Sequence, residues 1–169
     1  MAELVTITTL PPATRFVVRG GEAAIPLIGR AFGVALPRDA CRAASVPPRA
    51  ALWLGPDEWL LLAPDGDGER IASEIGAALT GAPASVVDIS DRQVALSVGG
   101  PRAATVVNAF NPLDLHPEAF PVGMCTRTVF AKAEIVLWRT AADGFRIEVW
   151  RSFAPYVEGL LREAAEEYA

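Results

Sequence analysis

The chain has 169 residues, of which 51% are hydrophobic, and a net charge of −5 at pH 7. The acidic balance argues against a nucleic-acid partner, because binding to phosphates requires a basic surface. No apolar run is long enough to span a bilayer, and the first residues lack the basic and apolar blocks of a signal peptide, so we expect a cytoplasmic protein. The length suits one compact domain or two small fused modules.

Strands and helices alternate in the first half of the chain. Alternating apolar residues indicate strands, and apolar residues three or four positions apart indicate helices. In chain order these patterns predict a strand at 4–10, a strand at 15–19, a helix at 22–32, a hairpin at 50–54 and 59–62, a helix on the apolar positions 71, 75 and 79, and a strand at 85–89. From residue 15 onward this is the β-α-β-β-α-β order of a ferredoxin-like module.

The same pattern recurs later in the chain. The apolar run, double glycine and Ala-rich segment at 17–32 correspond to those at 96–110. The second copy is expected to contain a helix beginning at Pro101, strands at 124–130, 134–139 and 145–150, and a helix capped by Ser152. Because no strand follows that helix, we expect residues 4–10 to close the second sheet.

The predicted fold class is therefore α+β. It consists of two tandem ferredoxin-like βαββαβ-type modules with antiparallel sheets and with helices on the outer faces. We expect residues 1–169 to form a single compact domain built from an internal repeat of about 12–90 and 92–167.

The strand patterns also indicate which faces are covered. At 145–149 apolar and charged residues alternate, so one face is expected to be solvated, whereas at 59–62 both faces are apolar and need cover. Helices cover only one face of such a sheet. The other face is expected to meet the sister module or another protein.

No combination of residues in the sequence indicates a catalytic or metal centre. His116 is the one histidine and lies in a proline-flanked loop, so a structural or solvated role is favoured over a catalytic one. The double glycines at 20–21 and 99–100 precede helices, where anions can bind, but tight turns are favoured because the rest of a dinucleotide motif is missing. The Asp-Gly-Asp-Gly segment at 65–68 starts like a calcium loop and lacks the later ligands.

Two cysteines and one group of charged residues need separate interpretations. Cys41 and Cys125 have no metal or redox spacing, so we expect buried thiols and no disulfide. Asp88, Asp91 and Arg92 lie at the junction between the two modules. Paired carboxylates can act in acid–base chemistry, but a turn held by Asx hydrogen bonds and by a partner in Arg92 is the favoured interpretation.

The four tryptophans, Trp53, Trp59, Trp138 and Trp150, all lie in predicted hairpin strands. Packing in the core is the simpler explanation for them. Tryptophan is also enriched at the energetically dominant positions of protein interfaces. All four are therefore candidates for contact with a partner.

Three stretches of the sequence resemble the gamma subunit of heterotetrameric sarcosine oxidase. They are residues 52–61, which contain a Gly-Pro-Asp-Glu-Trp turn, residues 87–92, which read Val-Asp-Ile-Ser-Asp-Arg, and the Pro-Leu-Asp-Leu-His-Pro segment at 112–117 that runs on to 131–139. The resemblance extends from about residue 15 to residue 161. The Asp-Ile-Ser segment is shared more loosely with the folate-binding aminomethyltransferases of glycine cleavage.

The resemblance implies a place in an oxidoreductase complex. Such a complex demethylates sarcosine oxidatively to glycine and passes the one-carbon unit to tetrahydrofolate. Its FAD, FMN, NAD and tetrahydrofolate belong to the larger subunits and its zinc to the smallest one, so no cofactor is expected in this chain. The gamma subunit is similar in fold to the folate-binding modules and is not known as the catalytic subunit.

Two functions remain as hypotheses. The first is a non-catalytic subunit that packs on the large flavoprotein subunit through apolar surface, including the hairpin at 53–62. The alternative is a stand-alone folate-binding one-carbon-transfer protein of the aminomethyltransferase type, in which residues 88–92 line a groove between the modules. Neither hypothesis involves a membrane or a nucleic acid.

Overall fold

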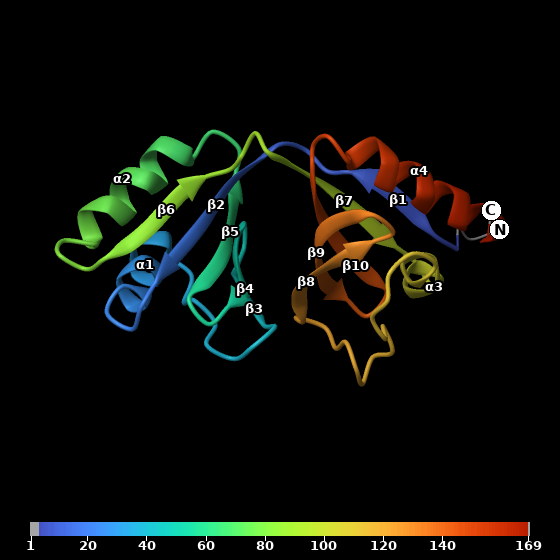
Figure 1. The fold of residues 1–169 in the computed structure, drawn as a ribbon, viewed down its shortest axis with the longest axis horizontal. Coiled ribbons are helices and arrows are strands. Elements are labelled where there is room, and N and C mark those ends of the chain that lie inside the picture. Colours follow the sequence, from blue (N-terminus) through green and yellow to red (C-terminus); the bar gives the residue numbers. More distant parts are fainter. Residues whose placement is uncertain (1–3, 169) are drawn as a thin grey trace. The chain divides into compact units, whose positions relative to one another are not determined.

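The computed structural model describes residues 4–168 and divides into two compact units (Figure 1). The first unit is Pro12–Ser90. The second unit begins at Asp91 and also includes the N-terminal residues up to Pro11. The internal repeat expected at 12–90 and 92–167 stays a prediction about how these units arose.

The first unit has the strand order of a ferredoxin-like module. Its elements are β2 (Ala13–Gly20), α1 (Ile25–Phe32), β3 (Ala43–Val46), β4 (Arg49–Gly55), β5 (Glu58–Pro64), α2 (Gly68–Ala78) and β6 (Ala84–Asp88). They form an antiparallel sheet in the order β3-β4-β5-β2-β6. The additional edge strand β3 lies in a proline-punctuated segment for which the sequence predicts only a connection.

The second unit repeats this order with a different source for its last strand. Its elements are β1 (Thr6–Thr9), β7 (Gln93–Gly99), α3 (Ala103–Asn108), β8 (Cys125–Phe130), β9 (Ala133–Ala141), β10 (Gly144–Trp150), α4 (Ala154–Ala165) and a 3-10 turn (Glu166–Tyr168). The antiparallel sheet runs β8-β9-β10-β7-β1. The predicted fold class, two ferredoxin-like modules with antiparallel sheets, is confirmed.

Strand β1 closes the second sheet, as the sequence predicts for residues 4–10. It pairs antiparallel with β7, and Thr6 lies opposite Gly99. The carbonyl of Leu4 accepts a hydrogen bond from the Arg102 amide at 3.0 Å. Gly100 makes this close approach possible, because its φ is +110° and a Cβ there would lie 2.7 Å from the Leu4 oxygen.

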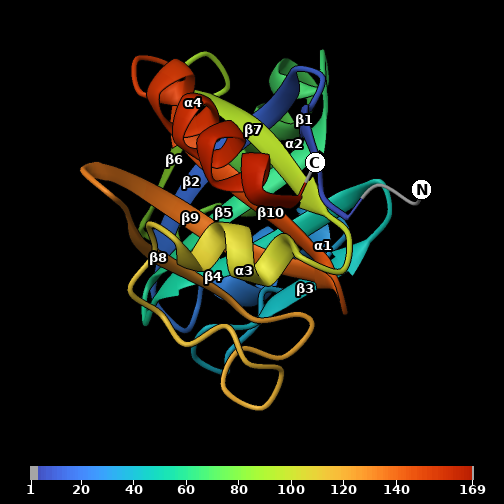
Figure 2. The same cartoon turned by 90° about the vertical axis from the view of Figure 1, so that its right-hand side faces the viewer.

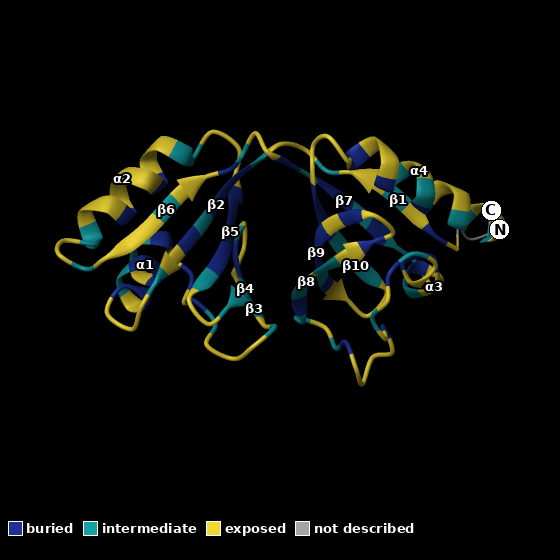
Figure 3. Ribbon diagram, in the orientation of Figure 1, coloured by how far each residue is buried: buried dark blue, intermediate teal, exposed yellow. Residues whose placement is uncertain are grey.

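In each unit the helices cover one face of the sheet. Helices α1 and α2 pack on the first sheet (Figure 1), and α3 and α4 lie in front of the second sheet in Figure 2. The first core joins Ile28 and Phe32 of α1 to Ile71 of α2 and to Phe16 and Leu61 of the sheet. Figure 3 shows that the sides of α2 and α4 that turn away from their sheets are exposed.

The second core is built in the same way. Val106 and Val107 of α3 and Val157 and Leu161 of α4 meet Ile147 of the central strand β10. All five side chains are at most 1% exposed. No helix among residues 4–168 has the length and apolar character needed to cross a membrane.

The burial of two strands tests the expectations drawn from their patterns. Strand β5 is buried on both faces from Trp59 to Ala63, as predicted. The prediction of a solvated face on β10 is wrong, because Glu148 is only 1% exposed. Its carboxylate forms an ion pair with Arg146 at 2.7 Å, and this pairing offsets part of the cost of burying the charge.

The starts of two helices also differ from the predictions. Pro101 lies two residues before α3, in the turn that leads to it, and the helix begins at Ala103. Ser152 does not cap α4, whose N-cap residue is Phe153 without a side-chain cap hydrogen bond. Pro155 occupies the first turn of α4 as predicted, since a helix start tolerates the missing amide hydrogen.

Candidate interface and junction residues

Two of the four tryptophans belong to the first unit and contribute to its interior. Trp59 of β5 is 1% exposed, and its Nε1 donates a hydrogen bond to the carbonyl of Pro37 at 2.8 Å. Trp53 of β4 lies opposite Trp59 in the sheet and is partly buried against the same core. The hydrogen bond ties the sheet to the connection that follows α1.

The other two tryptophans belong to the second unit. Trp138 of β9 is partly buried, and its buried Nε1 has no hydrogen-bond partner among the described residues. Trp150 at the end of β10 is 43% exposed. The guanidinium carbon of Arg92 lies 4.9 Å from the centroid of the Trp150 ring, which is a cation–π contact. Contact of these tryptophans with a partner stays a prediction.

The first of the junction residues, Asp88, holds the end of β6 in place. One carboxylate oxygen accepts hydrogen bonds from the amide of Ser90 at 2.8 Å and from its hydroxyl at 2.6 Å. The Ser90 hydroxyl oxygen accepts in turn from the Arg15 amide at 2.9 Å. This is an Asx turn that fastens the junction to β2, in agreement with the favoured interpretation of the Asp-Ile-Ser segment.

Asp91 and Arg92 make contacts of a different kind. Asp91 is exposed and lies 3.7 Å from Arg151, so the predicted pairing of a junction aspartate with Arg92 is wrong. Arg92 stacks on Trp150 instead. The Asx turn of Asp88 thus lies within the first unit, and these contacts of Asp91 and Arg92 lie within the second.

The loop at 111–121 is organised by polar groups that the sequence does not identify. Arg139 of β9 is 4% exposed, and its Nη1 donates to the carbonyls of Leu115 at 3.0 Å and Phe120 at 2.9 Å. Nη2 donates to the carbonyl of Ala142, and the guanidinium carbon lies 5.1 Å from the Phe145 ring centroid. A buried arginine thus serves as the anchor of the loop.

An asparagine fixes the start of the same loop. The amide of Asn111 donates to the carbonyl of Val129 at 2.7 Å, and its side-chain oxygen accepts from the Leu113 amide at 3.0 Å. His116 is exposed, and its Nδ1 accepts from the Glu118 amide at 3.3 Å. The Leu-Asp-Leu-His-Pro segment is therefore an ordered turn, and the histidine supports its local geometry.

The described residues include no group of metal ligands, and neither of their cysteines is exposed. Among residues 4–168, no three His, Cys, Asp or Glu side chains are grouped so that they could hold a metal ion. Cys41 and Cys125 are both thiols, and Cys125 is fully buried. Burial of this kind is typical of a structural cysteine rather than a reactive one.

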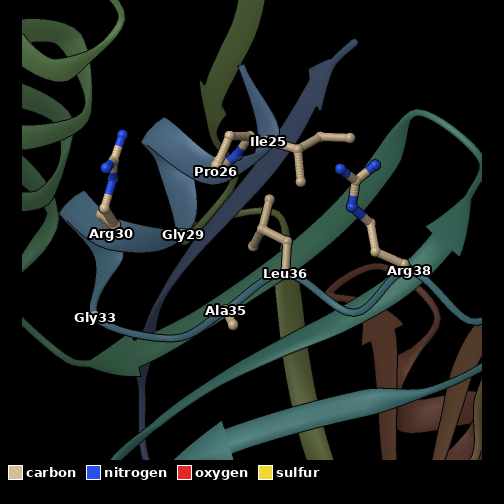
Figure 4. Close-up of a pocket in the computed structure, with 8 residues that line it drawn as sticks. All are labelled: Ile25, Pro26, Gly29, Arg30, Gly33, Ala35, Leu36 and Arg38. Atoms are coloured by element: carbon tan, nitrogen blue, oxygen red, sulfur yellow. The ribbon is translucent and has the colours of Figure 1, made fainter. Parts of the chain in front are cut away.

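A cavity of about 520 Å³ lies beside α1 and was not foreseen from the sequence (Figure 4). Ile25, Pro26 and Leu36 give it apolar walls, and Arg30 and Arg38 lie on either side of it. Glu22 accepts two hydrogen bonds from Arg38 at 2.6 and 2.8 Å, and these hold the pKa of Glu22 below its usual range. The charge of Arg38 is thus already balanced by Glu22.

The comparisons with known proteins agree with this architecture. The model of the sarcosine oxidase, gamma subunit family matches residues 20–167. The chain belongs to the sarcosine oxidase gamma subunit family. A sarcosine oxidase subunit gamma from Corynebacterium sp. (strain P-1) is 37% identical over 160 residues, which cover 93% of this chain and 78% of the relative.

Two solved structures are similar to this member of the family. One is a chain of the heterotetrameric sarcosine oxidase from Corynebacterium sp. U-96 in complex with pyrrole 2-carboxylate, with a TM-score of 0.92 and 32% identity over 99% of this chain and 87% of that one. The other is the glycine cleavage system aminomethyltransferase T from Bartonella henselae, with a TM-score of 0.72 and 16% identity over 93% of this chain and 45% of that one. At that identity the second likeness shows a shared fold.

Proposed function

We propose that this protein is the non-catalytic gamma subunit of a heterotetrameric sarcosine oxidase. In this role it packs on the large flavoprotein subunit and supports the oxidative demethylation of sarcosine to glycine. The observation that carries the proposal is the likeness, over 99% of this chain, to a chain of a heterotetrameric sarcosine oxidase, at a TM-score of 0.92 and 32% identity. The family match over residues 20–167 supports the same role.

The side chains support the non-catalytic part of the proposal. Asp88 is engaged in a turn with Ser90, Asp91 lies beside Arg151, and the one histidine is exposed and bonded within its own turn. We therefore assign the FAD, FMN, NAD, tetrahydrofolate and zinc of the complex to its other subunits. We also place the complex in the cytoplasm. The fold shared with an aminomethyltransferase does not by itself favour the folate-binding alternative.

Expression of the chain alone and together with the other subunits tests this proposal. We expect a stoichiometric complex on co-expression, and a colourless isolated chain that does not turn over sarcosine. A flavin spectrum or sarcosine turnover from the isolated chain would refute the non-catalytic role, and failure to join the large subunit would refute the subunit role. Micromolar binding of tetrahydrofolate to the isolated chain, measured by calorimetric titration, would restore the alternative.

A further inference from the structure

The exposed aromatic side chains of the described residues are confined to one short segment. Trp150 is 43% exposed, Phe153 43% and Tyr156 39%. All other Phe, Trp and Tyr side chains among residues 4–168 are buried or partly buried. Exposed aromatics cost solvation free energy, and their concentration in one place is typical of a surface that binds a partner.

The three residues lie close together along the chain, across the turn from β10 to α4. The turn between β10 and α4 is closed by a hydrogen bond from the Phe153 amide to the Trp150 carbonyl at 2.8 Å. Tyr156 follows Phe153 by three positions, so the two share one face of the first turn of α4. Ala154 and Val157 point into the core, and the opposite side of the helix start is thereby turned outward.

Arg92 adds a positive charge that has no anionic partner among the residues that the structure describes. Its guanidinium carbon lies 4.9 Å from the Trp150 ring centroid, and it forms no ion pair with any residue from 4 to 168. The nearby Arg151 differs, because it lies 3.7 Å from Asp91. A cation held over an exposed tryptophan is oriented in advance for a carboxylate and loses little side-chain entropy on binding.

We propose that Trp150, Phe153, Tyr156 and Arg92, which we call the aromatic surface, are where this protein docks on the large subunit of its complex. The matching surface of that subunit carries a carboxylate for Arg92 beside apolar side chains that cover the three rings. The inference rests on the proposed function, which supplies the partner. Arginine and aromatic residues are the types that contribute most binding energy at protein interfaces.

The charge of the aromatic surface favours this partner over a second copy of the chain. In a two-fold symmetric dimer centred on the aromatic surface, the two Arg92 side chains would approach each other, and like charges close together are unfavourable. An acidic counterpart on a different protein meets the cation without this repulsion. Self-association is therefore an outcome that the test must be able to detect.

Co-purification with the large subunit tests the aromatic surface directly. We expect Trp150→Ala to weaken binding to the large subunit by about 30-fold, because a central tryptophan is often an interface hot spot. Arg92→Glu should weaken it by at least about tenfold, since it places a negative charge opposite a carboxylate. The matched controls are Val122→Ala and Arg30→Glu, which change an exposed apolar residue and an exposed arginine elsewhere, and both should bind like wild type.

The outcomes separate this inference from the proposed function. If the wild-type chain does not join the large subunit, the proposed function fails and the inference fails with it. If the wild type joins and Trp150→Ala, Tyr156→Ala and Arg92→Glu all bind with wild-type affinity, only the inference is overturned. Circular dichroism of each variant checks folding, and Tyr156→Ala replaces Trp150→Ala if the latter does not fold. Self-association of the isolated wild type that Trp150→Ala abolishes, with binding to the large subunit unchanged, would also overturn it.

Discussion

Trp59 combines apolar packing with a hydrogen bond that joins two segments of the first unit. Its side chain is 1% exposed, and its Nε1 donates to Pro37 at 2.8 Å. We expect Trp59→Ala to lower the free energy of unfolding by about 3–5 kcal/mol, because a large cavity replaces the ring. Urea unfolding of the isolated chain, followed by far-ultraviolet circular dichroism, measures this loss.

The substitution Trp59→Phe separates the two contributions. It keeps most of the ring contact and removes the donor to the Pro37 carbonyl, so a smaller loss of roughly 1–2 kcal/mol is expected. A loss near zero for Trp59→Ala would contradict a structural role and would assign the residue to a partner surface. Equal losses for the two variants would show that the hydrogen bond, rather than the packing, dominates.

Individual side chains show where reasoning from the sequence stops. The apolar run around Trp59 is sufficient to predict burial on both faces of β5. The ion pair of Glu148 with Arg146 and the carbonyl cage around Arg139 are not visible in the sequence, because a charged residue in an alternating strand normally indicates solvent. Their partners are side chains or loop carbonyls whose positions only the folded chain defines.

Strand β1 depends on the backbone of Gly100, which lets the N-terminal segment approach β7. We expect Gly100→Ala to destabilise the fold by roughly 1–3 kcal/mol, because a φ of +110° is strained for alanine and its Cβ would lie 2.7 Å from the Leu4 oxygen. Amide hydrogen exchange should show faster exchange in β1 and at the edge of β7, with the first unit unchanged.

The neighbouring glycine provides the control for this prediction. A Cβ at Gly99 meets no atom within 4 Å, and no positive φ is required there. Gly99→Ala should therefore be neutral or slightly stabilising. If the two alanine variants exchange alike, the close approach of Leu4 is not what holds β1 in the sheet.

The elements themselves divide into those that local patterns determine and those that they do not. Both hairpins, α1 and α2 were predictable, since their apolar periods are clear over many residues. Strand β1 was predictable from topology, because the second module has no other strand to fill its edge position. Strand β3 was missed because the prolines around it at 37, 47 and 48 indicate a connection, and edge strands tolerate such residues.

The candidate sites were only partly accessible from the sequence for the same reason. The tryptophans and the junction residues could be named, and the apolar run around Trp59 predicts its burial, but no local pattern marks Trp150 as the exposed tryptophan. Phe153 and Tyr156 were missed because they read as ordinary positions at a helix start. One signal could have identified them, namely three aromatics within residues 150–156 at the end of an otherwise well-packed hairpin.

The two sheets have equivalent strand arrangements, but their last edge strands come from different places in the chain. The first closes with β6, which follows α2, and the second closes with β1, which precedes every other element. Moving β1 to a position after α4 would make the chain a plain tandem of two modules. Residues at the two ends of the described chain lie near a common point, because Arg102 bonds to Leu4 at 3.0 Å and stacks on the Tyr168 ring at 5.5 Å.

A circular permutant tests this description of the whole molecule. In it Tyr168 is joined to Leu4 by about eight Gly and Ser residues, which span roughly 16 Å on average, and the chain is opened between Ser90 and Asp91. We expect the permutant to fold with both sheets intact and with a melting temperature within about 4 °C of the original, since no strand pairing is removed.

A second permutant opened within β10, between Ile147 and Glu148, should fail to fold because it cuts a central strand of the second sheet. If both permutants unfold, the connection at 90–91 is itself needed for folding, and the two units are not the topological modules described above.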